Sequence, residues 1–134
     1  MTVTLNSLAD FTLEHCARVA WGGEAVELGG TAKRAIATAR VAFMLLIEKP
    51  DISIYGVNTG YGGRANVRLD SEGRKAQALQ PTHHRAASWG EALPDRVTRA
   101  IVFARLANFI EGHGAVSPAV AEAVANMLGG QSMP

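Results

Sequence analysis

The most distinctive chemistry in the sequence is a tyrosine on a glycine-rich loop. Tyr55 opens the segment Tyr-Gly-Val-Asn-Thr-Gly-Tyr-Gly, and four of the eight residues at 56–63 are glycine. Glycine allows backbone conformations that are closed to other residues, so this density favours a tight loop that a ligand can approach closely. A tyrosine there can act as a general base if its surroundings lower the phenol pKa from about 10. The residues alone leave a plainer interpretation open, a turn after a strand with Tyr55 half-buried.

A second group of candidate side chains lies further along the chain, at His83, His84 and Arg85. Imidazole and guanidinium groups donate hydrogen bonds, so this cluster can recognise a phenol or a carboxylate. It can equally be the solvated end of a helix, and the residues do not decide between the two. A metal site is disfavoured, because the two histidines are adjacent and no carboxylate or cysteine stands at a ligand-like spacing.

The bulk composition predicts a soluble globular protein. The 134 residues are enough for one domain, and the formal net charge of +1 gives no electrostatic footprint for nucleic acid. The longest strongly apolar run, at 41–47, is far shorter than the roughly 20 residues that cross a bilayer. We therefore expect a single domain over residues 1–134, with no nucleic-acid partner and no membrane association.

The compartment is predicted from the cysteine count and from the first residues. Cys16 is the one cysteine, which excludes an intramolecular disulfide and suits a reducing environment. The first ten residues lack the positive region and apolar stretch of a secretory signal. We expect the protein to be cytoplasmic.

Helical patterns dominate the elements that must position these residues, so the expected fold class is mainly α. Asp10 is the expected cap of the first helix and Thr31 that of the second, and Pro94 and Ser117-Pro118 open the last two. The predicted helices cover residues 11–20, 32–48, 70–80, 94–111 and 117–129, and the predicted extended segments cover 25–28 and 52–55.

The fourth predicted helix is apolar almost all round. Its expected inward side carries Val97, Ile101, Leu106 and Ile110, and further apolar residues nearly encircle it. A helix of this kind needs burial on several sides, and a short chain has few elements to cover it. We expect a large interface with other protein there.

The Tyr55 loop closely resembles the inner loop of the histidine, phenylalanine and tyrosine ammonia-lyase and aminomutase family. Further similarities are spread along the chain: Phe-Thr-Leu-Glu at 11–14, Ala-Trp-Gly-Gly at 20–23, Val-Glu-Leu at 26–28, Leu-Gln at 79–80 and Gly-Glu-Ala-Leu at 90–93. The resemblance implies the N-terminal helical domain of the ammonia-lyase type, with a short strand and a glycine-rich catalytic loop. It implies that Tyr55 is the catalytic base, and that Gly62 and Tyr61, where the family usually has phenylalanine, lie at the substrate.

Counting back from Gly90, the resemblance places His84 where tyrosine-selective members carry a histidine that reads the substrate ring, with Arg85 beside it. The sequence departs from the family in this region: Gln80 to His84 is about two residues shorter than usual, and Ser88 replaces a common glycine. The resemblance thus implies substrate binding by His84 and Arg85 on an altered pocket side.

The family's electrophile, methylidene-imidazolone, forms from an Ala-Ser-Gly tripeptide, and no Ala-Ser-Gly occurs in these 134 residues. The resemblance therefore implies that a larger lyase subunit carrying Ala-Ser-Gly supplies this cofactor in a hetero-oligomer, and that the present chain alone is inactive. Two alternatives stay open: a lyase-derived binding or regulatory module without catalysis, and a fragment of a longer lyase. The sequence does not identify the amino acid substrate, nor does it separate lyase from 2,3-aminomutase.

Overall fold

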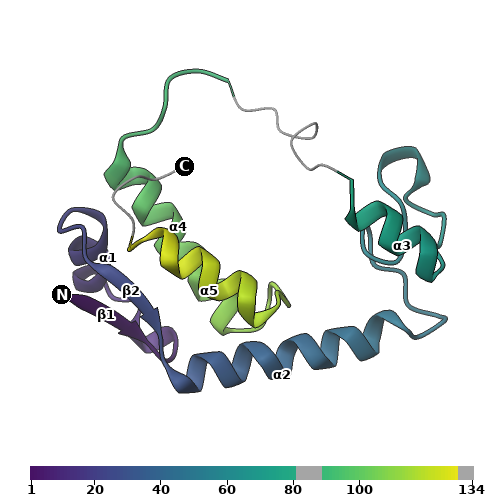
Figure 1. The fold of residues 1–134 in the computed structure, drawn as a ribbon, viewed down its shortest axis with the longest axis horizontal. Coiled ribbons are helices and arrows are strands. Elements are labelled where there is room, and N and C mark those ends of the chain that lie inside the picture. The colour runs from purple at the N-terminus through teal and green to yellow at the C-terminus, as the bar shows by residue number, and fades with distance from the viewer. Residues whose placement is uncertain (81–88, 130–134) are drawn as a thin grey trace. The chain divides into compact units, whose positions relative to one another are not determined.

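The protein is described here by a computed structural model that covers residues 1–80 and 89–129. Its described elements are mainly helical with one short two-stranded sheet, which confirms the predicted fold class (Figure 1). The elements are β1 (Thr2–Leu5), the 3-10 helix η1 (Leu8–Asp10), α1 (Leu13–Ala20), β2 (Ala25–Leu28), α2 (Gly30–Ile47), the 3-10 helix η2 (Gly62–Arg64), α3 (Ser71–Ala78), α4 (Asp95–Ile110) and α5 (Pro118–Met127).

The contacts within the chain form two compact units. The first comprises Met1–Ala42 and Ala92–Pro134, and the second is Phe43–Glu91, so the boundary falls inside α2. The prediction of one domain over residues 1–134 stays a prediction, because compact units of this size can fold together.

The sheet of the first unit contributes one wall of its core. Strands β1 and β2 pair in parallel, with Thr2 opposite Ala25 and Leu5 opposite Leu28. Alternate side chains of a strand point to the same face, and the buried ones here are Val3, Leu5, Val26 and Leu28. The predicted extended segment at 25–28 is confirmed, whereas β1 had no counterpart among the predicted elements.

Helix α1 starts later than predicted and has a different cap. The Thr12 hydroxyl accepts the His15 N–H at 3.1 Å. The predicted cap at Asp10 is wrong, because its carboxylate faces the preceding residues and accepts the N–H groups of Asn6 (2.7 Å) and Ser7 (2.9 Å). These two bonds, that from Asn6 foremost, hold the pKa of Asp10 below its usual value.

Helices α4 and α5 begin within one residue of their predicted starts. Pro94 precedes the first residue of α4, and Ser117 caps α5, where its hydroxyl accepts the Val120 N–H at 3.3 Å. Beyond the end of α4, Gly112 adopts φ +78°, a left-handed conformation that favours glycine.

The inward side of α4 differs from the prediction at two of its four positions. The buried stripe follows the spacing i, i+4, i+7, i+11 and consists of Arg99, Phe103, Leu106 and Ile110. Leu106 and Ile110 are thus confirmed, whereas Val97 and Ile101 are exposed because they lie off this stripe. An arginine occupies the stripe, which the apolar pattern alone could not indicate. The predicted large interface on this helix stays a prediction.

Arg99 ties three segments of the first unit together. Its guanidinium donates to the carbonyl oxygens of Val19 (2.7 Å), Glu24 (2.9 Å) and Leu128 (2.8 Å), and the residue is only 8% exposed. Those oxygens belong to α1, the turn before β2 and the end of α5. A planar guanidinium presents several N–H donors in a fixed fork, so one side chain satisfies all three acceptors.

Replacing Arg99 by methionine is expected to destabilise the fold by about 2 kcal/mol, because the three carbonyl groups lose their donor. Arg99→Lys is expected to recover little of this loss, since an ammonium lacks the fork geometry. The check is thermal or urea unfolding followed by circular dichroism, with Arg96→Met on the exposed side of α4 as the matched control. A fully stable Arg99→Met variant would contradict the account of this residue.

The second unit confirms one predicted helix and corrects one predicted strand. Helix α3 begins at Ser71, within one residue of the predicted start, and Asp70 caps it by accepting the Gly73 N–H at 2.7 Å. Residues 52–55 are not a strand: the Ile54 N–H and the Ile52 carbonyl bind the side chain of Asn58 instead of a neighbouring strand.

The predicted cap of the second helix is wrong. Helix α2 begins at Gly30, so Thr31 lies inside it and not at its cap.

Candidate functional site

The loop that carries Tyr55 folds back on itself through its backbone. Val57 and Asn58 donate their N–H groups to the Ile54 carbonyl at 3.0 and 3.2 Å, which closes a tight turn. Further along, Gly60 donates to the Val67 carbonyl at 3.1 Å. Leu69 donates to the Asn58 carbonyl at 2.9 Å. The two arms of the loop, at 58–60 and 67–69, therefore pair in an antiparallel arrangement. The loop thus has a fixed backbone conformation although it has few regular elements.

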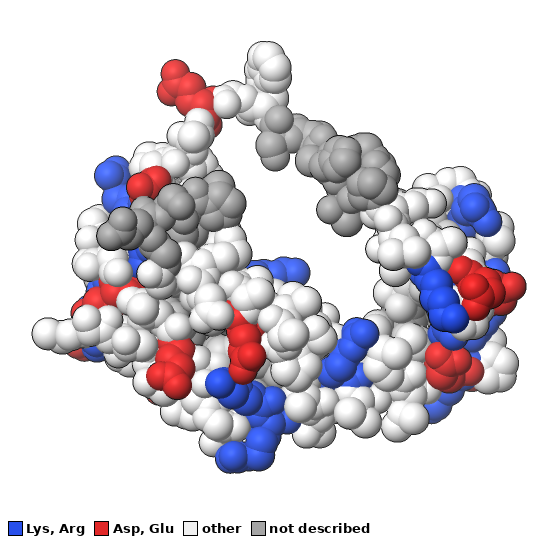
Figure 2. Space-filling model, in the orientation of Figure 1, with Lys and Arg blue, Asp and Glu red and all other residues white. Residues whose placement is uncertain are grey.

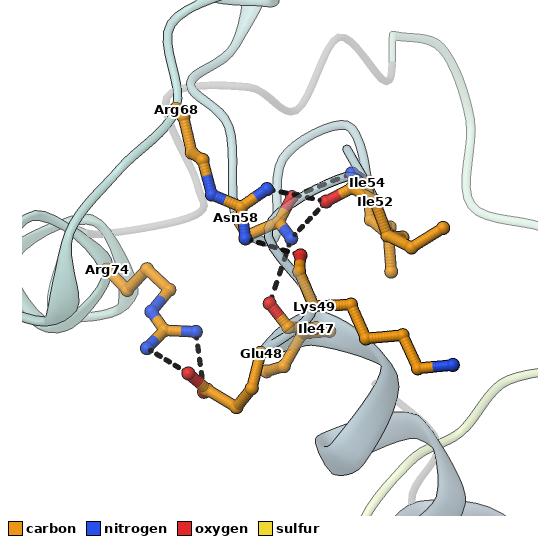
Figure 3. A network of polar contacts seen from close by, with 8 residues as sticks. All are labelled: Ile47, Glu48, Lys49, Ile52, Ile54, Asn58, Arg68 and Arg74. Carbon is orange, nitrogen blue, oxygen red and sulfur yellow. Dashed lines mark hydrogen bonds and ion pairs between the residues drawn. The ribbon is translucent and has the colours of Figure 1, made fainter.

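Asn58 is the buried centre of this loop (Figure 3). Only 1% of the residue is exposed, and all of its amide faces backbone groups. The side-chain oxygen accepts the Ile54 N–H at 2.7 Å, and the side-chain nitrogen donates to the carbonyls of Ile47 (3.1 Å) and Ile52 (2.9 Å). The end of α2 and the residues before Tyr55 are thus held by one side chain.

Arg68 fastens the same segment from the other arm of the loop (Figure 3). Its guanidinium donates to the carbonyl oxygens of Lys49 (2.7 Å), Pro50 (3.1 Å) and Ile52 (2.7 Å). These carbonyls follow the end of α2, where helical partners are no longer available. Arg68 is therefore a structural residue of the loop.

Helix α3 supports the glycine-rich part of the loop through Gln77. Its side-chain nitrogen donates to the carbonyls of Gly56 (3.1 Å) and Thr59 (3.2 Å). Two loop carbonyls on either side of Asn58 are thereby fixed to a regular helix. The position of Gly56, the residue after Tyr55, is therefore fixed relative to helix α3.

An ion pair links α3 to the residue that follows α2. Arg74 contacts Glu48 through two nitrogen–oxygen pairs at 2.8 and 3.3 Å (Figure 3). The hydrogen bonds from Arg74 hold the pKa of Glu48 below its ordinary value of 4.5. Because the pair is exposed to water and salt, its contribution to stability is small.

Tyr55 lies at the surface of this loop, next to Tyr61 and Gly62. The phenol oxygen of Tyr55 accepts the Gly62 N–H at 3.1 Å, and 63% of the residue is exposed. The two tyrosine rings meet edge to face, with centroids 5.8 Å apart and planes at 88°. The N–H of Gly62 and the ring of Tyr61 therefore fix where the phenol oxygen of Tyr55 lies.

Gly56 makes this approach of the two rings sterically possible. It adopts φ +70°, and a Cβ atom there would come within 2.4 Å of Cε1 of Tyr61. Glycine is required both for the left-handed backbone and for the close contact. By contrast, a Cβ at Gly63 would meet no atom within 4 Å.

The Gly56→Ala variant is expected to lose about 1–3 kcal/mol of stability, because alanine is strained at this φ and displaces the Tyr61 ring. Thermal unfolding measures the loss, and the fluorescence of the two tyrosines reports the displaced ring. Gly63→Ala is the matched control in the same loop, and we expect it to unfold at the temperature of the parent protein or slightly above. Equal behaviour of the two variants would refute the packing argument.

The structure brings together three of the five predicted site residues, Tyr55, Tyr61 and Gly62. His84 and Arg85 lie outside the described residues. The catalytic role of Tyr55 and the substrate-binding roles of the other four stay predictions. Sequence reasoning missed Asn58, Gln77 and Arg68 as supports of the site, although the asparagine within a glycine-rich loop was a signal for side-chain to backbone hydrogen bonds.

Metal and membrane features were also sought along residues 1–80 and 89–129. Within these ranges, no three His, Cys, Asp or Glu side chains come together as a metal site. None of the helices described there has the length and apolar character to cross a membrane.

Comparison with known proteins identifies the family. The sequence profile of the family described as Aromatic amino acid lyase matches residues 11–134. Histidine ammonia-lyase of Streptomyces avermitilis is 37% identical over 110 residues, which cover 82% of this chain and 21% of that protein. Histidine ammonia-lyase of Deinococcus radiodurans is 35% identical over 129 residues, which cover 93% of this chain and 24% of that protein.

The fold agrees with the sequence match. The crystal structure of tyrosine aminomutase from Streptomyces globisporus superposes with a TM-score of 0.79 at 28% identity, over 96% of this chain and 24% of that one. The chain spans about a quarter of the length of the relatives it matches. Profile, relatives and fold together show that this chain belongs to the aromatic amino acid lyase family, as part of its N-terminal portion.

Proposed function

We propose that this chain is the small subunit of a split ammonia-lyase or 2,3-aminomutase that acts on an aromatic or related α-amino acid. The observation that carries the proposal is the exposed phenol of Tyr55, positioned by Gly62 and Tyr61 in a chain of the lyase family. The named activities of the relatives, histidine ammonia-lyase and tyrosine aminomutase, support both the reaction class and the substrate class.

In this proposal Tyr55 is the base that removes a proton from the β-carbon of the substrate. The phenol oxygen is fixed by the Gly62 N–H on one side and its ring by Tyr61 on the other. Its open side can face a substrate presented by another polypeptide. After proton removal the amine either leaves as ammonia or is added back at the β-carbon, which are the lyase and the aminomutase outcomes.

The family's methylidene-imidazolone does not fit these residues as its source, because the tripeptide Ala-Ser-Gly is absent from them. The exposed side of Tyr55 does fit a group presented from outside the chain. When bound, that group withdraws electrons through the substrate amine and makes the β-hydrogen removable. We therefore propose that a larger lyase subunit carrying Ala-Ser-Gly supplies the methylidene-imidazolone. The two chains form a hetero-oligomer in this proposal, and neither chain is active alone.

We place this hetero-oligomer in the cytoplasm, because the single cysteine suits a reducing compartment and leaves no intramolecular disulfide. No role for nucleic acid or a membrane surface enters the proposal. The substrate-contacting residues on this chain would include Tyr61 and Gly62, together with His84 and Arg85.

Native mass spectrometry of the protein purified from its own source tests the proposal. A stable complex with a larger chain that contains Ala-Ser-Gly is expected, and it opens a direct screen of amino acid substrates. A homo-oligomer with no such chain would leave Tyr55 without an electrophile and would favour a binding module. A single longer polypeptide beginning with this sequence would instead show that these residues are one part of an undivided lyase.

A further inference from the structure

Helix α3 is held on the Tyr55 loop by polar side chains. None of its residues is buried, and Figure 2 shows Lys and Arg beside Asp and Glu around this helix. On its outer surface Lys75 pairs with Glu72 at 2.9 Å. Arg74 and Gln77 are three residues apart, so they share a face of the helix, and each binds another segment of the second unit. Hydrogen bonds, and not apolar packing, therefore hold α3 in place.

Gln77 bridges the segment that links Tyr55 to Gly62. Its Nε2 atom donates to the Gly56 carbonyl at 3.1 Å and to the Thr59 carbonyl at 3.2 Å. Gly56 directly follows the tyrosine, and Thr59 lies three residues before the N–H that the phenol oxygen accepts. The two bonds therefore fix the two sides of the Tyr55–Gly62 contact relative to each other.

The Thr59 carbonyl is the more sensitive of the two acceptors. Thr59 is only 2% exposed, so water has little access to it. A buried carbonyl that loses its donor carries a desolvation cost, which a movement of the backbone toward water relieves. Tyr61 and Gly62 follow within three residues, so such a movement displaces both groups that hold the Tyr55 phenol.

The other two side chains that support the loop bind residues before Tyr55. Asn58 and Arg68 both bind backbone groups within 47–54. The bonds from Gln77 lie after Tyr55 instead. Removing Gln77 should therefore disturb the contact of the phenol while these anchors stay in place.

We propose that Gln77 is a positioning residue for proton removal by Tyr55, and that it acts through the loop backbone without touching the substrate. This inference rests on the proposed function and deepens it by naming a side chain outside the loop that sets where the phenol oxygen lies. A displacement of about 1 Å at a catalytic group can lower the rate about a hundredfold. Two hydrogen bonds to the backbone beside Tyr55 are therefore sufficient to affect turnover, while substrate affinity changes little.

The first test is steady-state kinetics of the enzyme assembled with a Gln77→Met chain. Methionine resembles glutamine in length and helix propensity, but it donates no hydrogen bond. We expect kcat to fall about 10–100-fold and KM to stay within about threefold of the parent value. Lys75→Met is the matched control on the same helix, because this side chain points to Glu72 on the outer surface. Its kcat and KM are expected to equal those of the parent enzyme.

The second test is amide hydrogen exchange of the present chain alone, which needs neither a partner nor a substrate. The Gly62 N–H, whose acceptor is the Tyr55 phenol, is expected to exchange about tenfold faster in Gln77→Met than in the parent. The Leu69 N–H, whose acceptor is the Asn58 carbonyl at 2.9 Å, is expected to keep its parent rate. A general loosening of the loop would raise both rates, so the two amides separate positioning from stability.

Each contrary result has a distinct meaning. Parent-like kcat of the Gln77→Met enzyme, or parent-like exchange at Gly62, would overturn the positioning role and leave the split enzyme standing. Equal acceleration at Gly62 and Leu69 would overturn it as well, because Gln77 would then be a structural residue of the loop. A parent enzyme without turnover would overturn the proposed function, and the exchange rates would still decide whether Gln77 positions the phenol.

Discussion

Replacing Tyr55 by phenylalanine is expected to lower the turnover of the assembled enzyme by about 10²–10⁴-fold, the usual contribution of a general base. The complex itself should form as before, because the lost hydroxyl is exposed and its one donor, the Gly62 N–H, can bind water. The edge-to-face contact with Tyr61 needs only the ring, which phenylalanine retains. Steady-state ammonia release or product formation, with native mass spectrometry of the same sample, measures both effects.

Tyr61→Phe is the comparison that separates the two phenols. Its ring still packs against Tyr55 and Gly56, so the position of the Tyr55 oxygen is preserved. We expect less than a tenfold loss of turnover, concentrated in KM if the Tyr61 hydroxyl contacts substrate. A Tyr55→Phe complex with parent-like turnover would remove Tyr55 from the proposed chemistry.

The Asn58→Ala variant is expected to lose about 3 kcal/mol of stability in the second unit. Three backbone groups, the Ile54 N–H and the carbonyls of Ile47 and Ile52, lose a partner that water does not reach easily. Because Asn58 holds the residues before Tyr55, the loop should also become more mobile. Hydrogen exchange at the Ile54 amide and thermal unfolding measure the local and the overall effect.

Asn58→Asp is the isosteric control, because it keeps the accepted hydrogen bond and removes the two donated ones. An ionised carboxylate still accepts the Ile54 N–H, but it repels the two carbonyl oxygens to which the amide donated. We expect it to be destabilising at neutral pH and less so at acidic pH, where the protonated acid regains one donor. Stability equal to that of the parent protein at pH 7 would show that the two donated bonds contribute little.

The sequence indicates the helices whose ends are marked by local chemistry. Ser117 and Pro118 start α5, Asp70 caps α3, and Gly112 follows the end of α4 with a left-handed backbone. In each case the signal and the contact lie within a few residues of one another. Such local hydrogen bonds are written in the chain without reference to the rest of the fold.

The two main misses come from polar side chains that bind backbone groups, close by in the chain for Asn58 and far away for Arg99. Residues 52–55 read as a strand by composition, but the side chain of Asn58 takes the hydrogen bonds that a neighbouring strand would have made. Arg99 occupies the buried stripe of α4 because three carbonyls of other elements surround it. No period of apolar residues reveals a buried polar group whose partners come from elsewhere in the chain.

The candidate site likewise has a part that the sequence predicts and a part that it does not. Tyr55, Tyr61 and Gly62 were singled out as one segment, and the structure brings them together because the loop itself is short and rich in glycine. Gln77 lies on α3 and Arg68 on the second arm of the loop, and neither has a sequence signal for this role. The grouping of these three residues on one loop was therefore predictable from sequence, whereas the side chains that support the loop were not.

The central claim is that turnover needs the Tyr55 loop of this chain and the electrophile of a second one. The most direct measurement is reconstitution: the two purified chains are mixed in increasing ratio, and ammonia release or aminomutase product is followed with histidine, tyrosine and phenylalanine. We predict no activity from either chain alone, activity that saturates at a fixed stoichiometry, and no rescue by the Tyr55→Phe chain although it still binds. Full activity of the larger chain by itself would contradict the claim.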